Sequence, residues 1–168
     1  MKLSSFEAIV SALQSAEVRY LIVGGLAVAA HGHGRATFDV DLVVQLLSDN
    51  IARGVKALEN LGYRPTVPVT AAQFADAHHR ESWIRDKNMV VFQMRSDHHP
   101  ETSIDLFVSE PFDFNTEYER AMIGDILPGL PARFVSLETL LRMKESAGRP
   151  KDLEDIRQLQ LLTRDHQG

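Results

Sequence analysis

The stretch YLIVGGLAVAAHGHGRATFDVDLVV, residues 20–44, decides the fold of this chain. An apolar run ends at the pair Gly24-Gly25, and a short apolar segment follows over residues 26–30. A second strand-like run then carries Asp39 and Asp41 between apolar residues. Such alternation is typical of a half-buried β-strand. The stretch therefore predicts a strand, a glycine turn, a short helix and a second strand.

The glycine pair indicates a place where the backbone approaches a ligand closely, because glycine has no side chain. Residues 26–30 are interpreted as the first turns of a helix. Free N–H groups at a helix N-terminus attract anions. A tight turn without a ligand is the alternative interpretation of Gly24 and Gly25. The carboxylates downstream favour a phosphate site.

Asp39 and Asp41 are expected to project together, because strand residues two apart share a face. Val40 and Leu42 then face the core. Two carboxylates about 6–7 Å apart along a strand can share divalent metal ions. A solvated polar face is the alternative, but the apolar neighbours argue against it. A carboxylate pair beside a phosphate site suits metal-assisted phosphoryl or nucleotidyl transfer.

In this order, Gly24-Gly25 and Asp39-x-Asp41 resemble the hG[GS]…Dh[DE]h pattern of the polymerase-beta-like nucleotidyltransferase superfamily. The resemblance implies an α/β fold with a nucleoside triphosphate as substrate and Mg²⁺ or Mn²⁺ as cofactor. It also implies that the two glycines hold the β- and γ-phosphates. Arg35, in the loop before the strand, is either a phosphate contact or a solvated loop residue.

Enzymes of this superfamily use a third acidic residue on a later strand. Asp105 in SIDLF, residues 103–107, matches that position, with Ile104 and Leu106 facing the core. The resemblance thus implies a metal site formed by Asp39, Asp41 and Asp105. Two alternatives remain for Asp105: it is the general base for an attacking hydroxyl, or it is an ordinary surface carboxylate.

The C-terminal stretch LLRMKESAGRPKDLEDIRQL, residues 140–159, resembles the helical tail of the AbiEii-type, toxin-related branch. In that branch a lysine of the first helix contacts nucleotide phosphates, and an acidic residue of a Lys-Asp motif is needed for activity. By position, these roles fall to Lys144 and Asp152. Without the resemblance, the same residues read as charges on two exposed helix faces.

The resemblance implies transfer of a nucleoside monophosphate to an acceptor, with a tRNA 3′ end as the acceptor used by toxin-related relatives. A protein hydroxyl or a small molecule such as an aminoglycoside-like alcohol remains open. A second hypothesis is a non-catalytic nucleotide- or partner-binding module, one half of a toxin–antitoxin pair with a cognate antitoxin. A plain structural α/β domain is the third.

The whole sequence sets the limits of these interpretations. Its 168 residues predict one compact domain, with a nucleotidyltransferase core over residues 1–135 and a C-terminal helical extension over residues 136–168. A net charge of −5 argues against a protein that coats nucleic acid over its whole surface. The sequence has no cysteine, no long apolar span and no signal-peptide pattern, so we expect a cytoplasmic protein without a membrane segment.

The expected fold is a mixed twisted sheet of four or five strands flanked by helices, with a small C-terminal helical pair. Besides the strand that carries Asp39, strands are expected over residues 18–23, 63–69, 89–94 and 103–108. The stretch 126–134, with Pro128, Gly129 and Pro131, is interpreted as an extended segment.

Overall fold

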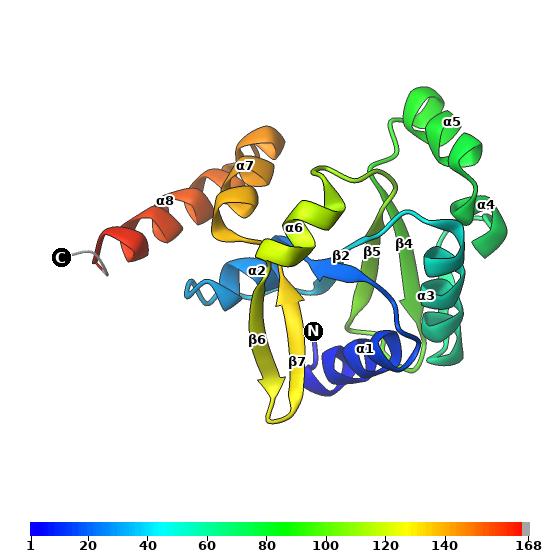
Figure 1. The fold of residues 1–168 in the computed structure, drawn as a ribbon, viewed down its shortest axis with the longest axis horizontal. Helices are drawn as coiled ribbons and strands as arrows, with labels where there is room; N and C mark the ends of the chain where they lie inside the picture. Colours follow the sequence, from blue (N-terminus) through cyan, green and yellow to red (C-terminus); the bar gives the residue numbers. More distant parts are fainter. Residues whose placement is uncertain (166–168) are drawn as a thin grey trace.

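The structure, a computed structural model, describes residues 1–165, over which the chain forms eight helices and seven strands (Figure 1). In chain order they are α1 (Leu3–Ser15), β1 (Tyr20–Ile22), α2 (Gly24–Ala30), β2 (Asp39–Val44), α3 (Ser48–Asn60), β3 (Tyr63–Pro65), α4 (Ala71–Ala75), α5 (Ala77–Lys87), β4 (Val91–Ser96), β5 (Ser103–Phe107), α6 (Phe114–Arg120), β6 (Met122–Leu127), β7 (Leu130–Phe134), α7 (Leu137–Ala147) and α8 (Pro150–Asp165).

All seven strands belong to one mixed sheet, in the order β3-β4-β5-β2-β1-β7-β6. The central strand β2 is antiparallel to β1 and parallel to β5. Beyond β1, the sheet continues with β7, which runs parallel to β1, and ends with β6, which is antiparallel to β7. The predicted α/β class and the C-terminal helical pair are therefore confirmed.

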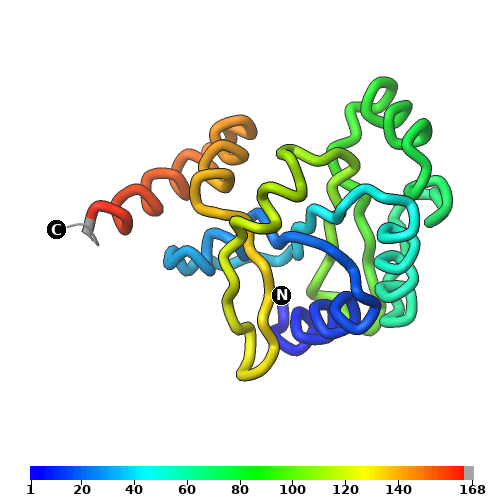
Figure 2. The backbone as a smooth tube through the Cα atoms, viewed as in Figure 1, coloured from blue at the N-terminus to red at the C-terminus, as the bar shows by residue number. Residues whose placement is uncertain are grey.

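The predicted number of strands was too low, because residues 126–134, interpreted as one extended segment, belong to a hairpin of two strands, β6 and β7. Residues 128–129 form its turn, and Gly129 has the positive φ of +80° that a tight turn needs. β6 and β7 pair on either side of that turn and extend beside α1 (Figure 2). β7 also pairs with β1 through Phe134 and Ile22, which adds the hairpin to the sheet.

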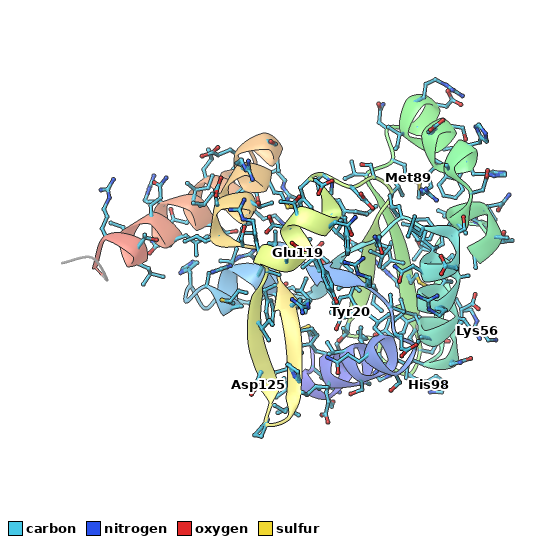
Figure 3. All side chains as sticks on the ribbon, in the orientation of Figure 1. Tyr20, Lys56, Met89, His98, Glu119 and Asp125 are labelled. Carbon is cyan, nitrogen blue, oxygen red and sulfur yellow. The ribbon has the colours of Figure 1, made fainter. Side chains whose placement is uncertain are left out.

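The sheet is covered by helices whose apolar stripes face it. α1 and α3 contact each other, α1 also contacts β7, and α3 contacts β2. Ile9 and Leu13 of α1, with Val55 and Leu58 of α3, are almost completely buried. In Figure 3, Tyr20 of β1 lies in the interior, whereas Lys56 and Asp125 stand at the surface. The core thus lies against β1 and β2, the strands that flank the glycine turn.

The C-terminal pair lies at the end of the molecule opposite α5, and the tip of α8 points away from the sheet (Figure 1). Ser136 caps α7 by accepting a hydrogen bond from the N–H of Thr139, and Gly148 ends the helix at φ +61°. α7 contacts both α2 and α8. This packing brings the C-terminal helices beside the turn between β1 and α2. No helix in residues 1–165 has the length and apolar character needed to cross a bilayer.

Candidate active site

A cleft of about 160 Å³ gathers every predicted site residue except Asp152. Its walls come from the start of α2, the loop before β2, the strands β2 and β5, and the corner between α7 and α8. The lining residues are Gly24, Gly25, Arg35, Ala36, Thr37, Phe38, Asp39, Asp41, Asp105, Lys144, Arg149 and Lys151.

Parallel pairing of β2 and β5 brings the three acidic residues together. Asp41 stands directly opposite Asp105, and Asp39 stands opposite Ser103. Ser103 donates a hydrogen bond to Oδ1 of Asp39. Gln93 of β4 donates to Oδ1 of Asp105 over 3.0 Å. Neighbouring strands therefore hold one oxygen of each of these two carboxylates, and sequence analysis identified neither donor.

The acidic residues repel one another when no cation is present. Burial, then the charges of Asp105 and Asp39, raises the pKa of Asp41 from 3.8 to about 6. Burial also raises the pKa of Asp105, with a further contribution from Asp39. Lys144 opposes the rise at Asp41 but does not cancel it. A concentration of negative charge of this kind favours a bound cation.

The donor set fits a hard divalent cation, because Mg²⁺ and Mn²⁺ prefer carboxylate oxygens. Asp39, Asp41 and Asp105 would hold it. Within residues 1–165, no group of three His, Cys, Asp or Glu side chains is arranged so that it could hold a metal ion as it stands. The fit therefore rests on the chemistry of the three carboxylates and on their placement along paired strands.

The glycine turn packs closely against Asp41. Gly24 has φ +63°, and a Cβ at this position would lie 2.0 Å from Oδ2 of Asp41. The backbone N–H of Gly25 forms a hydrogen bond that lowers the pKa of Asp41, against the larger effect of burial. The carboxylate therefore rests directly on the start of α2. Only glycine leaves room for it.

We expect Gly24→Ala to displace Asp41 and to destabilise the fold. The left-handed backbone alone costs about 1–2 kcal/mol for a residue with a side chain. The clash with Asp41 adds to this, so the melting temperature should fall by at least about 3 °C. Differential scanning fluorimetry measures the shift. Gly34→Ala is the control, because its Cβ would meet no atom within 4 Å. Equal melting temperatures for the two variants would contradict the proposed contact.

The cationic wall of the cleft is held from behind by two acids of α8. Lys144 Nζ lies 3.0 Å from Asp152 Oδ1 and 2.7 Å from Asp155 Oδ2. Arg149 Nε lies 2.6 Å from Asp152 Oδ2, and Arg35 Nε lies 2.9 Å from Asp155 Oδ1. Three cations from three parts of the chain thus meet two acids one helical turn apart.

Asp152 lies behind Lys144 rather than in the cleft. It is fully buried. Burial acts to raise its pKa, but hydrogen bonds from Arg149 and Lys144 outweigh burial and lower the pKa to about 2. Asp152 is therefore ionised at neutral pH and touches the cations of the cleft.

Sequence analysis missed Asp155. Its signal was the spacing of three from Asp152, which places both carboxylates on one face of α8. From the sequence alone, however, a charged helix at the end of the chain is interpreted as exposed to solvent. The partners of Asp155 are Lys144 and Arg35, which lie 11 and 120 residues earlier in the chain. Side-chain exposure of only 2% at Asp155 shows that α8 turns this face inward.

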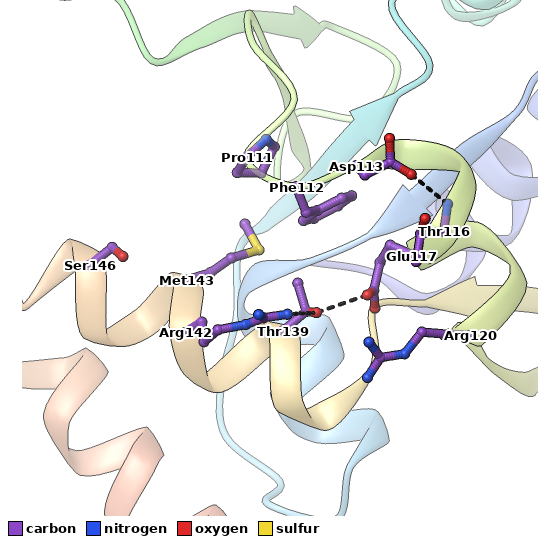
Figure 4. A pocket seen from close by; sticks show the side chains of 10 residues that line it. All are labelled: Pro111, Phe112, Asp113, Thr116, Glu117, Arg120, Thr139, Arg142, Met143 and Ser146. Atoms are coloured by element: carbon purple, nitrogen blue, oxygen red, sulfur yellow. Dashed lines mark hydrogen bonds between the residues drawn. The ribbon is translucent and has the colours of Figure 1, made fainter.

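A second, larger cleft of about 580 Å³ lies between α6 and α7 (Figure 4). Phe112 and Met143 form an apolar part of its wall. Arg142 donates to Thr139 over 2.9 Å, and Thr139 donates to the buried Glu117 over 2.8 Å. None of the predicted site residues lines this cleft. The cleft with the three carboxylates remains the candidate active site.

A family model that covers almost the whole chain shows that the protein with this sheet and cleft belongs to the nucleotidyltransferases. More specifically, the chain belongs to the family described as "Nucleotidyltransferase of unknown function (DUF6036)", whose model matches residues 2–165. The predicted nucleotidyltransferase assignment is thereby confirmed, and the AbiEii-type branch remains a prediction. No curated protein matches the sequence.

Solved structures share the fold at low sequence identity. The solution structure of the antibiotic-resistance factor ANT(2″)-Ia has a TM-score of 0.59 at 16% identity, covering 94% of this chain and 81% of that chain. A crystal structure of ANT(2″)-Ia in complex with adenylyl-2″-tobramycin has a TM-score of 0.55 at 16% identity, covering 94% and 86%. An antigenic nucleotidyltransferase-like protein from Paracoccidioides brasiliensis has a TM-score of 0.54 at 19% identity, covering 95% and 75%.

Proposed function

We propose that the protein transfers a nucleoside monophosphate from a nucleoside triphosphate to a hydroxyl-bearing acceptor, with the help of a divalent metal ion. One observation carries the proposal: three carboxylates and four cationic side chains line the same cleft. The carboxylates suit a metal ion, and the cations suit a chain of phosphates. Membership of a nucleotidyltransferase family supports the same reaction.

The triphosphate would lie between the glycine turn and the α7–α8 corner. An ammonium group has three N–H donors; Lys144 donates one of them to Asp152, and Asp155 lies at ion-pair distance. At least one donor remains for a phosphate oxygen. Lys151 also lines the cleft, and no ion pair or hydrogen bond holds its side chain among the described residues. It can turn towards a ligand.

The chain's own residues contribute position and charge to the reaction. A divalent ion on Asp39, Asp41 and Asp105 would supply Lewis-acid stabilisation of the phosphoryl oxygens. Arg35 and Lys144 neutralise the charge that grows on the leaving pyrophosphate as the acceptor oxygen attacks the α-phosphorus in line. Asp105, held by Gln93, is the acid that could also accept the hydroxyl proton.

Phe38 gives the cleft an apolar side. This phenylalanine lines the cleft next to Asp39 but leaves 68% of its surface exposed. An aromatic ring in that position offers a stacking surface to a nucleobase or to a ring of the acceptor. It is the one large apolar side chain among the lining residues.

Two classes of acceptor fit the proposal. The resemblance to toxin-related enzymes favours a tRNA 3′ end, with a cognate antitoxin as the partner of the protein. The fold shared with ANT(2″)-Ia, solved with adenylyl-2″-tobramycin, favours a small hydroxyl-bearing molecule. A net charge of −5 limits any RNA footprint to the basic corner around Arg149 and Lys151.

The test is a transfer assay with each of the four α-³²P-labelled nucleoside triphosphates, in Mg²⁺ or Mn²⁺. Total tRNA, cell lysate and an aminoglycoside mixture serve as separate acceptor pools. We expect label to move to one pool in a reaction that EDTA abolishes. Label in tRNA and label in a small molecule distinguish the two acceptor classes. Nucleotide binding without transfer to any pool would favour a non-catalytic module instead.

A further inference from the structure

Asp155 touches both cations that flank the phosphate region of the cleft. It is 2% exposed and lies on α8. One of its oxygens lies 2.9 Å from Arg35 Nε, and the other lies 2.7 Å from Lys144 Nζ. The two cations come from the loop before β2 and from α7, which otherwise share no ion-pair partner in residues 1–165.

The geometry leaves the ligand-facing donors of both cations available. Arg35 uses Nε for Asp155 and Nη1 for the carbonyl oxygen of Ala36. Its Nη2 lies over the glycine turn, 3.1 Å from where a Cβ of Gly25 would stand. Lys144 is only 5% exposed but lines the cleft. Asp155 therefore holds each cation by the side that faces away from the cleft.

Packing alone does not account for so many buried charges. α8 already anchors itself through Leu159, which is 1% exposed. Apolar residues of similar volume usually stabilise a helix contact at least as well as a buried ion network does. A buried acid that fixes two cations at one cleft has a clear use when a phosphate must meet both at once.

We infer that Asp155 is a positioning residue, which orients Arg35 and Lys144 together so that both meet the triphosphate. This inference rests on the proposed function, because it assigns the two cations to the nucleotide. α8 then completes the site from behind, although only the α7–α8 corner and not Asp155 itself lines the cleft.

The test compares Asp155→Asn with Glu154→Gln. Asparagine keeps the shape of the side chain and removes its charge. Glu154 is the adjacent exposed acid of α8, which is paired with Arg157 at 3.3 Å and does not line the cleft. Binding of ATP, CTP, GTP and UTP, each with Mg²⁺ and without acceptor, is measured by isothermal titration calorimetry. Asp155→Asn should weaken binding of the preferred nucleotide by about 10- to 100-fold, and Glu154→Gln should leave it unchanged.

Two further readouts separate positioning from a general loss of structure. In steady-state assays kcat/KM for the nucleotide should fall by more than the dissociation constant rises, because Arg35 and Lys144 also neutralise the charge that grows on the leaving pyrophosphate. In ¹H–¹⁵N spectra, the Nε signal of Arg35 should change its chemical shift in Asp155→Asn but not in Glu154→Gln, because the carboxylate charge 2.9 Å from Nε is lost. In an Arg35→Gln background, Asp155→Asn should weaken binding less than it does alone.

Each outcome decides between the two proposals. A folded Asp155→Asn that binds nucleotide like the wild type overturns the positioning role and leaves the proposed function standing. A wild type that binds none of the four nucleotides overturns both. Should Asp155→Asn fail to fold, Arg35→Gln replaces it, because Arg35 is partly exposed and leaves the Asp155–Lys144 pair intact. Unchanged binding in a folded Arg35→Gln then overturns the inference.

Discussion

Asp39→Asn combined with Asp41→Asn should reduce nucleotidyl transfer by about a thousandfold or more. The two substitutions remove two of the three carboxylates that face one another across β2 and β5. Metal ions contribute several kcal/mol to such transition states, and each 1.36 kcal/mol changes the rate tenfold. The label-transfer assay measures the loss. Nucleotide binding should persist, because Lys144 and Arg35 remain.

The same variant should be more stable than the wild type when no metal is present. The pKa of Asp41 is raised from 3.8 to about 6, so the ionised carboxylate is less favourable in the folded protein than in the unfolded chain. Wild-type stability therefore declines as the pH rises from about 4 through about 6. The variant lacks the part of this decline that Asp41 causes. It should gain about 1–3 kcal/mol in EDTA at pH 8 and little at pH 4.

The control is Asp125→Asn, which changes an exposed carboxylate on the outer strand β6. It should affect neither transfer nor melting temperature. Adding Mg²⁺ should raise the melting temperature of the wild type and of this control but not that of the double variant. Metal-dependent transfer that survives the double substitution would refute the assignment of Asp39 and Asp41.

Lys144→Met should destabilise the protein strongly, whatever its role towards the nucleotide. Methionine matches the length of the stem but leaves Asp152 and Asp155 buried near each other without the cation between them. Breaking a buried ion network by removing one partner costs about 3–5 kcal/mol. For a chain of this length, the melting temperature should fall by about 6–20 °C. Thermal denaturation followed by circular dichroism measures the shift.

A second substitution distinguishes the missing cation from lost packing. Asp155→Asn in the Lys144→Met background removes one of the two repelling acids, so it should restore part of the stability. Lys56→Met is the matched control, since Lys56 is exposed on α3. A Lys144→Met protein as stable as that control would show that the ammonium group is dispensable for the α7–α8 contact.

The local parts of the site could be predicted from the sequence. The alternation around Asp39 and Asp41 marks a strand with one apolar face, and the same pattern around Asp105 marks a second one. Glycine at position 24 predicts a turn with a backbone conformation that few other residues can adopt. These features depend on neighbours two to five residues away, so periodicity and residue type are enough to reveal them.

The meeting of distant segments could not be predicted in this way. The hairpin β6–β7 joins the sheet through pairing of Phe134 with Ile22, a contact between residues 112 positions apart. Asp41 lies against Gly24, which makes the glycine turn a support for a carboxylate as well as a candidate phosphate site. Neither contact leaves a periodic signal, because each depends on how whole strands are placed.

What the sequence by itself determined is the class of fold and the set of charged residues available for chemistry. Only the tertiary structure decided their orientation, because the order of strands and the docking of α7 and α8 set which side chains meet. Lys144 and Arg35 face the cleft, whereas Asp152 and Asp155 lie behind them, since buried carboxylates must pair with cations. Through these ion pairs, the charged C-terminal helix α8 packs behind the cations of the candidate active site and holds them in place.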